Sequence, residues 1–320
     1  MQDLNTYSDL SRKIIDNINT VIVGKESVIE KAVAALIAGG HLLIEDVPGV
    51  GKTVLAKSLA TTIGCSFRRI QFTPDLLPTD ITGVSIYNQD TRDFEFKPGP
   101  ILSQVVLADE INRATPKSQS ALLEAMEENQ VTVDGTTHLL DRPFIVVATQ
   151  NPIEYEGTFP LPEAQLDRFL IRVTLGYPDI SQELDIIDRL ETEHPLSTLG
   201  SVVAPKDIIA LQDASISVYV DQAIRQYIVN IVEWTRHREQ ISLGASPRAS
   251  IGLFHTCRAL ALIRGRDYVI PDDVKELATP VLAHRLVLSA SARISPATAS
   301  QIISDLLEFV PVPIQTDKLR

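Results

Sequence analysis

A glycine-rich loop between a predicted strand and a predicted helix constrains this chain more than any other feature. Residues 45–53 read Glu-Asp-Val-Pro-Gly-Val-Gly-Lys-Thr, after an apolar run at 41–45 and before a helical pattern at 53–63. Glycines let the backbone wrap around phosphate groups with its N–H groups pointing inward, and the helix N-terminus adds positive potential. The loop therefore predicts a phosphate-binding site at the end of a strand.

Two side chains of this loop carry the predicted chemistry. Lys52 would reach the β- and γ-phosphates of a nucleotide, and the Thr53 hydroxyl would ligate Mg²⁺. The strict pattern of such loops begins with glycine, where this chain has Asp46. The remaining core of Gly49, Gly51, Lys52 and Thr53 is intact, so we expect phosphate binding despite that departure.

A pair of acidic residues ends another predicted strand. The run Val105–Ala108 is apolar, and Asp109 and Glu110 follow it directly. A strand of this kind delivers both carboxylates to the carboxyl edge of the sheet, where α/β proteins bind their ligands. Asp109 can hold Mg²⁺ through its water shell, and Glu110 can orient and polarise an attacking water as a general base.

The first half of the chain alternates short apolar runs with helical patterns. Such alternation favours a parallel sheet covered by helices, and short continuous apolar runs are typical of strands buried on both faces. We expect an α/β domain with helices at 8–18, 25–38, 53–63 and 116–128, and with strands at 41–45, 67–72, 105–108, 144–148 and 170–173.

The pattern changes after residue 177. Strand-like runs nearly vanish, and helical periods dominate at 180–193, 206–212, 222–238, 247–264, 272–286 and 297–309. We therefore expect an α/β domain at 1–177 and an all-helical domain at 178–320. Two hairpins are expected as insertions in the first domain, at 83–97 and at 129–141, where Asp134-Gly135 is a strong turn signal.

Composition excludes several classes of protein. The chain has 320 residues, of which 44% are hydrophobic, and a net charge of −12, so it can bury a core without disulfides. Cys65 and Cys257 give neither a disulfide framework nor a metal-ligand spacing, which fits a reducing compartment. No apolar run reaches the roughly 20 residues of a membrane span, and the first residues lack a signal-peptide pattern. We expect a cytoplasmic protein, and its acidic charge disfavours a nucleic-acid partner.

With Asn-Arg-Ala at 112–114 after the acidic pair, these motifs resemble the AAA+ ATPases and, within them, the MoxR family. Supporting segments follow in the expected order, and the resemblance extends from about residue 8 to about residue 310. They read Val-Gly-Lys-Glu at 23–26, Ala-Thr-Gln-Asn-Pro at 148–152, Leu-Pro-Glu-Ala-Gln-Leu-Asp-Arg-Phe at 161–169 and Gly-Ala-Ser-Pro-Arg at 244–248. The resemblance implies an αβα core with a parallel five-stranded sheet and a C-terminal helical lid.

The resemblance also implies roles for individual residues. Asn151 would contact the γ-phosphate and its water as sensor 1, Arg168 would be an arginine finger, and Arg248 would be sensor 2 on the lid. The catalytic residues would be Lys52, Glu110, Asn151, Arg168 and Arg248. The magnesium ligands would be Thr53 and Asp109. The residues binding the nucleotide would be Val23, Gly24, Pro48, Gly49, Val50, Gly51, Lys52, Thr53, Val54, Asp109 and Arg248.

An arginine finger that acts in trans would leave a monomer without full activity, because such an arginine is worth about 10³–10⁵ in rate. The resemblance therefore implies a ring, usually a hexamer, and Arg113 is a second candidate for a residue acting in trans. The ring would couple Mg-ATP hydrolysis to the remodelling or activation of a client protein, often with a separate von Willebrand A-domain partner.

Three alternatives remain open: a magnesium-chelatase-type motor subunit, a nucleic-acid translocase and a nucleotide-gated scaffold that does not hydrolyse. A translocase would carry Lys or Arg on its hairpins, yet the hairpin at 129–141 contains neither, and the charged residues at 83–97 sum to −1. These charges disfavour nucleic acid. Tyr87, Phe94 and Phe96 could instead contact a protein partner.

Overall fold

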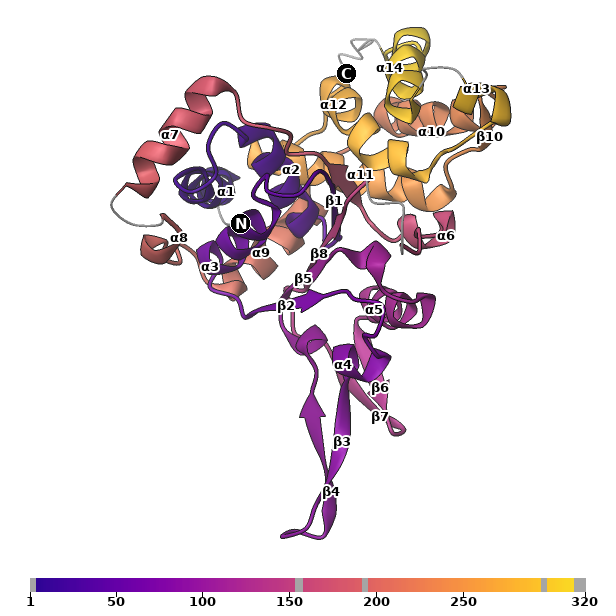
Figure 1. Cartoon of the computed structure of the whole chain (residues 1–320). Coiled ribbons are helices and arrows are strands. Elements are labelled where there is room, and N and C mark those ends of the chain that lie inside the picture. Colours follow the sequence, from indigo (N-terminus) through magenta and orange to yellow (C-terminus); the bar gives the residue numbers. More distant parts are fainter. Residues whose placement is uncertain (1–3, 153–157, 192–194, 295–297, 314–320) are drawn as a thin grey trace. The chain divides into compact units, whose positions relative to one another are not determined.

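The computed structural model describes residues 4–152, 158–191, 195–294 and 298–313. Contacts divide the chain into two compact units (Figure 1). The α/β unit runs from Asp9 to Gln212, and the helical unit comprises the residues before and after it. Helix α1 (Leu4–Asn19) belongs to both, because its first turn lies before Asp9.

A parallel five-stranded sheet forms the centre of the α/β unit. Its strand order is β2-β5-β8-β1-β9, and every neighbouring pair is parallel. This confirms the predicted fold class, because each strand coincides within a few residues with one of the expected apolar runs. The strands are β1 (Leu42–Glu45), β2 (Phe67–Gln71), β5 (Val105–Asp109), β8 (Ile145–Gln150) and β9 (Ile171–Val173).

Helices cover the sheet because its central strands, β5, β8 and β1, are apolar on both faces. One buried cluster joins Val106 and Ala108 of β5 and Val146 and Ala148 of β8 to the apolar side of helix α5. Alternate side chains of a strand point to opposite faces, so the remaining strand residues face other helices. The helices of this unit after α1 are α2 (Glu26–Ile37), α3 (Lys52–Thr62), α4 (Pro78–Thr82), η1 (Pro100–Leu102), η2 (Ile111–Arg113), α5 (Pro116–Glu128), α6 (Glu163–Leu166), α7 (Ile180–Leu190), α8 (Pro195–Thr198) and most of α9 (Pro205–Ile216).

The change in sequence pattern near residue 177 marks the end of the last strand of the sheet. Contacts nevertheless group α7, α8 and α9 up to Gln212 with the α/β unit. Helix α7 begins after Asp179, whose side chain accepts a hydrogen bond from the backbone N–H of Gln182 and caps the helix. The helical pattern after residue 177 therefore begins with helices that complete the α/β unit.

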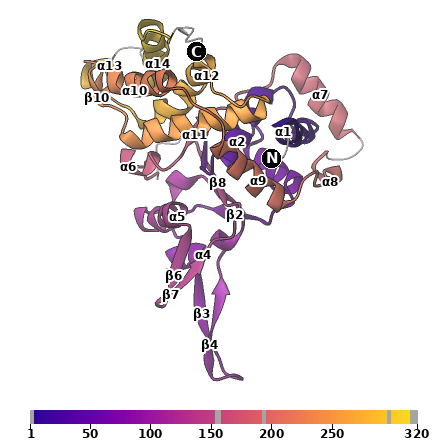
Figure 2. The same ribbon diagram turned by 180° about the vertical axis from the view of Figure 1, so that it is seen from behind.

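Two hairpins project from the α/β unit on the same side as α4 (Figure 1, Figure 2). They are β3 (Gly83–Asn88) with β4 (Asp93–Pro98), and β6 (Gln130–Val133) with β7 (Thr136–Leu139). The second turns at Asp134 and Gly135, whose φ angles of 50° and 78° are those that a two-residue hairpin turn requires. The rings of Phe96 and His138 stack at 4.0 Å between centroids and join the two hairpins.

The helical unit is built around α11, which packs against α10 and α12. Its last four helices are α12 (Pro271–Leu282), η3 (Ala283–Arg285), α13 (Ala290–Ile294) and α14 (Ala299–Phe309), after α10 (Gln222–Arg236) and α11 (Pro247–Ile263). One detail differs from the expected all-helical domain: β10 (Ile241–Leu243) and β11 (Val287–Leu288) form a short antiparallel pair. Segments this short carry too little alternation for a prediction. Within the described ranges, no helix combines the length and apolar character needed to cross a bilayer.

Candidate active site

The glycine-rich loop joins β1 to α3 in the predicted manner. Gly49 and Gly51 have φ angles of 85° and 94°, and Gly51 is the residue that caps α3. A side chain would meet no atom within 4 Å at either position, so glycine is required there by backbone conformation rather than by space. Lys52 and Thr53 consequently begin α3, at the helix end whose N–H groups attract anions.

The ammonium group of Lys52 lies against its own loop. Its Nζ donates a hydrogen bond of 2.6 Å to the backbone carbonyl of Asp46. The Asp46 carboxylate, on a residue only 5% exposed, accepts hydrogen bonds from the backbone N–H groups of Val47 and Gly176. The position at which strict phosphate loops carry glycine is thus occupied here by a buried, fully engaged side chain.

The acidic pair stands where β5 ends, as predicted. Asp109 is 7% exposed and lies between partners from the two strands that flank β5. Thr149 of β8 donates its hydroxyl to Oδ1 at 2.6 Å, and Arg69 of β2 places Nη2 2.7 Å from Oδ2. Both partners donate to the carboxylate and fix its orientation at the sheet edge.

Glu110 leaves the strand with a φ angle of 57°, in the left-handed region. Its backbone N–H donates to the Thr149 hydroxyl at 2.8 Å. Its Oε2 accepts hydrogen bonds from Gln71 Nε2 at 2.7 Å and from Arg113 Nη1 at 2.8 Å. The backbone turn and the two donors hold the carboxylate at the sheet edge.

Sequence reasoning missed Arg69 and Gln71. Both lie on β2 two residues apart, so they share one face of the sheet, and a hydrogen bond between them links the partners of Asp109 and Glu110. The signal was present as polar residues within a run that we expected to be an apolar strand. Such a pattern indicates an edge strand, and β2 is indeed the first strand of the sheet order.

Asn151 follows β8, the strand between β5 and β1, and is 5% exposed. The backbone N–H of Asp46 donates to the carbonyl of the preceding residue, Gln150, at 3.1 Å. The structure therefore brings the phosphate loop, the acidic pair and Asn151 to the ends of three adjacent strands. This is the carboxyl edge at which parallel sheets bind ligands.

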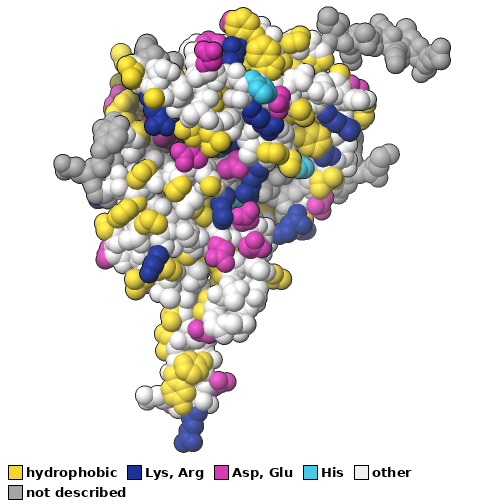
Figure 3. Space-filling view, turned by 90° about the vertical axis from the view of Figure 1, so that its right-hand side faces the viewer, with side chains coloured by type: hydrophobic (Ala, Val, Ile, Leu, Met, Phe, Trp, Pro, Cys, Tyr) yellow, Lys and Arg dark blue, Asp and Glu magenta, His cyan; other side chains and the backbone are white. Residues whose placement is uncertain are grey.

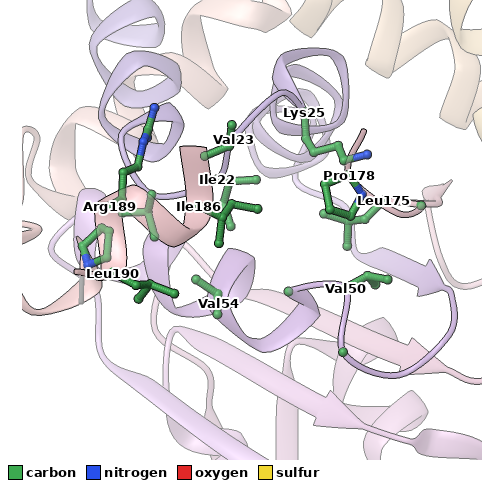
Figure 4. A pocket seen from close by; sticks show the side chains of 15 residues that line it. Ile22, Val23, Lys25, Val50, Val54, Leu175, Pro178, Ile186, Arg189 and Leu190 are labelled. Carbon is green, nitrogen blue, oxygen red and sulfur yellow. The ribbon is translucent and has the colours of Figure 1, made fainter. Parts of the chain in front are cut away.

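A pocket of about 260 Å³ adjoins the phosphate loop. Figure 4 shows Leu175 and Pro178 on one side of it, Ile186 and Leu190 of α7 on the other, and Val50 on the loop below. Its lining is mostly apolar and includes the predicted Val23, Gly49, Val50, Gly51 and Val54, together with Val21, Ile22, Lys25, Leu175, Gly176, Pro178, Ile186, Arg189, Leu190 and Pro195.

Helix α7 closes this pocket, a contribution that the sequence did not reveal. Gln182 packs so closely on Gly24 that a side chain at position 24 would collide with it. Arg189 donates to the carbonyl of Thr20 at 2.7 Å and pairs with Asp185 at 2.8 Å. At the start of α7, the hydroxyl of Ser181 lowers the pKa of Asp179 below its ordinary value, so the cap stays ionised at neutral pH.

The two remaining arginines belong to other segments of the chain. Arg168 donates to the carbonyl of Leu123 at 2.5 Å and pairs with Glu127 at 2.9 Å, both on α5. Arg248 is exposed on the first turn of α11 in the helical unit, directly after the capping Ser246 and Pro247. Arg113 contacts Glu110 of its own chain.

Comparisons with known proteins agree with this architecture. The model of the ATPase family associated with various cellular activities (AAA) matches residues 41–171, and that of the AAA lid domain matches residues 233–306. A crystal structure of a protein from Cytophaga hutchinsonii has a TM-score of 0.91 and 40% identity, covering 97% of each chain.

Two curated relatives match along nearly the whole chain. Protein YeaC of Bacillus subtilis is 53% identical over 96% of both chains. Chaperone MoxR1 of Mycobacterium tuberculosis is 44% identical over 95% of this chain and 82% of its own length. With its parallel sheet, phosphate loop and lid, the chain belongs to the MoxR family of AAA+ ATPases.

Proposed function

We propose that this chain binds Mg-ATP and hydrolyses it to drive conformational work on a client protein. The observation that carries the proposal is the meeting of three strand ends. The phosphate loop follows β1, Asp109 and Glu110 end β5, and Asn151 follows β8, with an apolar pocket beside the loop. A triphosphate on the loop would place its terminal phosphate toward the acidic pair and its base toward the pocket.

The residues present suit a magnesium ion. The Thr53 hydroxyl and the Asp109 carboxylate offer the hard oxygen ligands that Mg²⁺ prefers, and donors from Thr149 and Arg69 hold the Asp109 carboxylate in place. When bound, the ion would offset the negative charge of the phosphates. Lys52 would leave the carbonyl of Asp46 for the phosphates, a short movement of a flexible side chain.

Glu110 is the proposed general base. In the structure Gln71 and Arg113 both donate to its Oε2, which orients the carboxylate, and its other oxygen, Oε1, would accept a hydrogen bond from the water. Asn151 would hold the same water and the terminal phosphate. General-base assistance of this kind contributes about 10²–10⁴ in rate.

The pocket supports a purine base rather than a charged group. Its walls are formed mainly by aliphatic side chains from the segment before α2 and from α7, with Val54 of α3 at its floor. An apolar slot of this kind gains its affinity from burial of a flat ring. We propose adenine as its occupant, with Val23 and Gly24 alongside.

We infer an oligomer from the contacts of Arg168. Its guanidinium is engaged with α5 of its own chain, so a role at a terminal phosphate would be at the site of a neighbouring subunit. We propose a ring, with six subunits as the family-implied number. Arg248 would complete the site as the lid closes.

The β3–β4 hairpin is the proposed contact with the client. Tyr87 is 50% exposed and Phe94 is 69% exposed, and their rings pack edge to face at 5.4 Å. Figure 3 shows hydrophobic side chains gathered on this projecting hairpin. Phe96, by contrast, stacks on His138 and serves internal packing. The chaperone name of the mycobacterial relative supports a protein client. A von Willebrand A-domain partner and a cytoplasmic setting are proposed on the family resemblance alone.

The test is to measure ATP binding and turnover for the wild type and two variants. Lys52→Ala should abolish ATP binding, because it removes the only phosphate-loop cation. Glu110→Gln, which keeps shape and hydrogen-bonding capacity, should bind ATP normally and lose at least about 100-fold in turnover. A wild type that binds ATP without turnover at any protein concentration would point to the scaffold alternative, and no ATP binding would refute the proposal.

A further inference from the structure

We infer that Asp46 is a positioning residue whose carboxylate ties the phosphate loop to the wall of the base pocket. The inference rests on the proposed nucleotide-binding function and adds to it a residue outside the set that the motifs imply. Asp46 occupies the position that is glycine in the strict phosphate-loop pattern. The presence of a carboxylate at this position therefore needs a physical explanation.

Each carboxylate oxygen of Asp46 serves a different segment. Oδ1 accepts the backbone N–H of Val47 at 2.8 Å, at the start of the phosphate loop. Oδ2 accepts the backbone N–H of Gly176 at 2.7 Å, after the last strand of the sheet. The two segments are 130 residues apart in sequence, and this one side chain joins them by charge-assisted hydrogen bonds.

Gly176 lies within the segment that forms one wall of the pocket. Leu175 precedes it and Pro178 follows it, and both line the cavity (Figure 4). Lys25, which also lines the pocket, donates its Nζ to the carbonyl of Tyr177 at 3.0 Å. The wall thus has two polar attachments, and Asp46 provides the one to the phosphate loop.

Electrostatics argues that the carboxylate is kept for this connection and not for its charge. A buried negative group beside a site for phosphates opposes their binding, and the repulsion is strong where water is excluded. The two N–H donors offset part of the free-energy cost of burying the carboxylate. They do not remove its repulsion of the bound phosphates. A net benefit for nucleotide binding must therefore come from fixing the loop and the wall relative to each other.

Two ligands should respond differently to the loss of this connection. A complete nucleotide touches both the loop and the wall, so it gains from their fixed separation. Inorganic tripolyphosphate would contact only the loop, so the charge of Asp46 repels it and the fixed separation of loop and wall does not help it to bind. Removing the connection should therefore weaken the binding of ATP and leave the binding of tripolyphosphate unchanged or make it stronger.

The experiment compares Asp46→Asn and Asp46→Gly with the wild type. Asn has one acceptor oxygen, so only one of the N–H groups of Val47 and Gly176 would keep its hydrogen bond, and the other would face the NH₂ group. Gly removes both hydrogen bonds and is the residue of the strict pattern, so this backbone accepts it. Asp90→Asn, on the exposed tip of the first hairpin, is a control with the same change of charge. A thermal-unfolding scan of each variant checks that it is folded.

Dissociation constants for ATP and for tripolyphosphate are measured by calorimetry. We expect the Kd for ATP to rise about tenfold in both Asp46 variants, as for the loss of a hydrogen bond to a charged group. The Kd for tripolyphosphate should stay constant or fall, and Asp90→Asn should match the wild type for both ligands. Equal weakening of both ligands, or an unchanged Kd for ATP, would overturn the inference.

A double-mutant cycle adds an independent readout. If Asp46 fixes the wall, the loss of ATP affinity caused by Ile186→Ala should be smaller in the Asp46→Asn background than in the wild type, because a base that has lost the wall on one side packs less closely against Ile186 on the other. Additive effects would count against the connection. If the wild type itself fails to bind ATP, the proposed function is refuted. If the wild type binds ATP and the variants do not discriminate between the ligands, only the role of Asp46 is refuted.

Discussion

The amide of Gln71 donates a hydrogen bond of 2.7 Å to the carboxylate of Glu110, the residue proposed to activate water. The two residues come from neighbouring strands, and Gln71 stands opposite Asp109 in the parallel register. Gln71 and Arg113 donate to the same oxygen of Glu110, so they hold the carboxylate in one orientation and determine where a water would meet its other oxygen.

Replacing Gln71 tests whether this hydrogen bond restrains the base. Gln71→Ala removes one of the two side-chain donors that hold Glu110 in place, so the carboxylate can turn more freely toward a water. We expect basal ATP turnover to rise about threefold to tenfold with little change in KM, as for a modest net hydrogen-bond energy. Steady-state kinetics measures both quantities. Arg68→Ala, on the same strand but outside this network, is the control, and a fall in turnover would show that Gln71 supports the base.

A trans-acting Arg168 would make turnover depend on protein concentration. Arg168→Ala should still bind ATP, lose at least about 10³-fold in turnover, and show no rise in specific activity as subunits associate. Glu127→Gln breaks the same ion pair while leaving the arginine in place. If Arg168 were only a partner of Glu127, both variants would lose stability alike and keep their turnover. Wild-type activity that is flat across the range of dissociation would contradict a shared site.

Much of the fold and of the phosphate-binding half of the site follows from local sequence. Gly49 and Gly51 are needed for backbone conformation, and Asp109 ends a strand that is apolar throughout. Patterns of this kind are visible in a window of a few residues. A parallel sheet then brings its strand ends together without further information, which is why the loop, the acidic pair and Asn151 were predicted to converge.

The base pocket and the partners of the acidic pair could not be predicted from local sequence. Ile186 and Leu190 reach the pocket because α7 folds back over the segment before α2. Gln71 reaches Glu110 because β2 pairs with β5, although the strands are separated by an insertion that includes a hairpin. Such contacts depend on tertiary packing. Periodicity identifies α7 as an amphipathic helix and does not say which ligand its inner face meets.

The inner face of α7 can be tested against its outer face. Ile186 lines the pocket, whereas its neighbour Ile187 is 60% exposed. Ile186→Ala should raise the KM for ATP about tenfold with kcat nearly unchanged, because it removes aliphatic surface that would contact the base in ground and transition states alike. Ile187→Ala is the matched control and should leave both constants unchanged. An equal response of the two variants would place the base elsewhere.

The lid contains a buried ion pair whose loss should be costly. Asp273 is fully buried, and Arg266 binds both of its carboxylate oxygens, at 2.6 and 2.8 Å. Its Oδ2 also accepts the backbone N–H of Ile270 at the start of α12. Removing the arginine leaves a carboxylate in the core without its main counter-charge, and such a change costs about 3–5 kcal/mol.

We therefore expect Arg266→Ala to lower the free energy of unfolding of the lid by about 3–5 kcal/mol in urea titrations. Arg264→Ala is the control, because Arg264 is 3.8 Å from Asp273 and pairs mainly with Glu276 at 2.9 Å. Its cost should stay near 1 kcal/mol or below, as for a surface ion pair. Because the lid carries Arg248, Arg266→Ala should also reduce turnover more than ATP affinity. Similar losses of stability in both variants would mean that Asp273 is neutralised by the pair of arginines together.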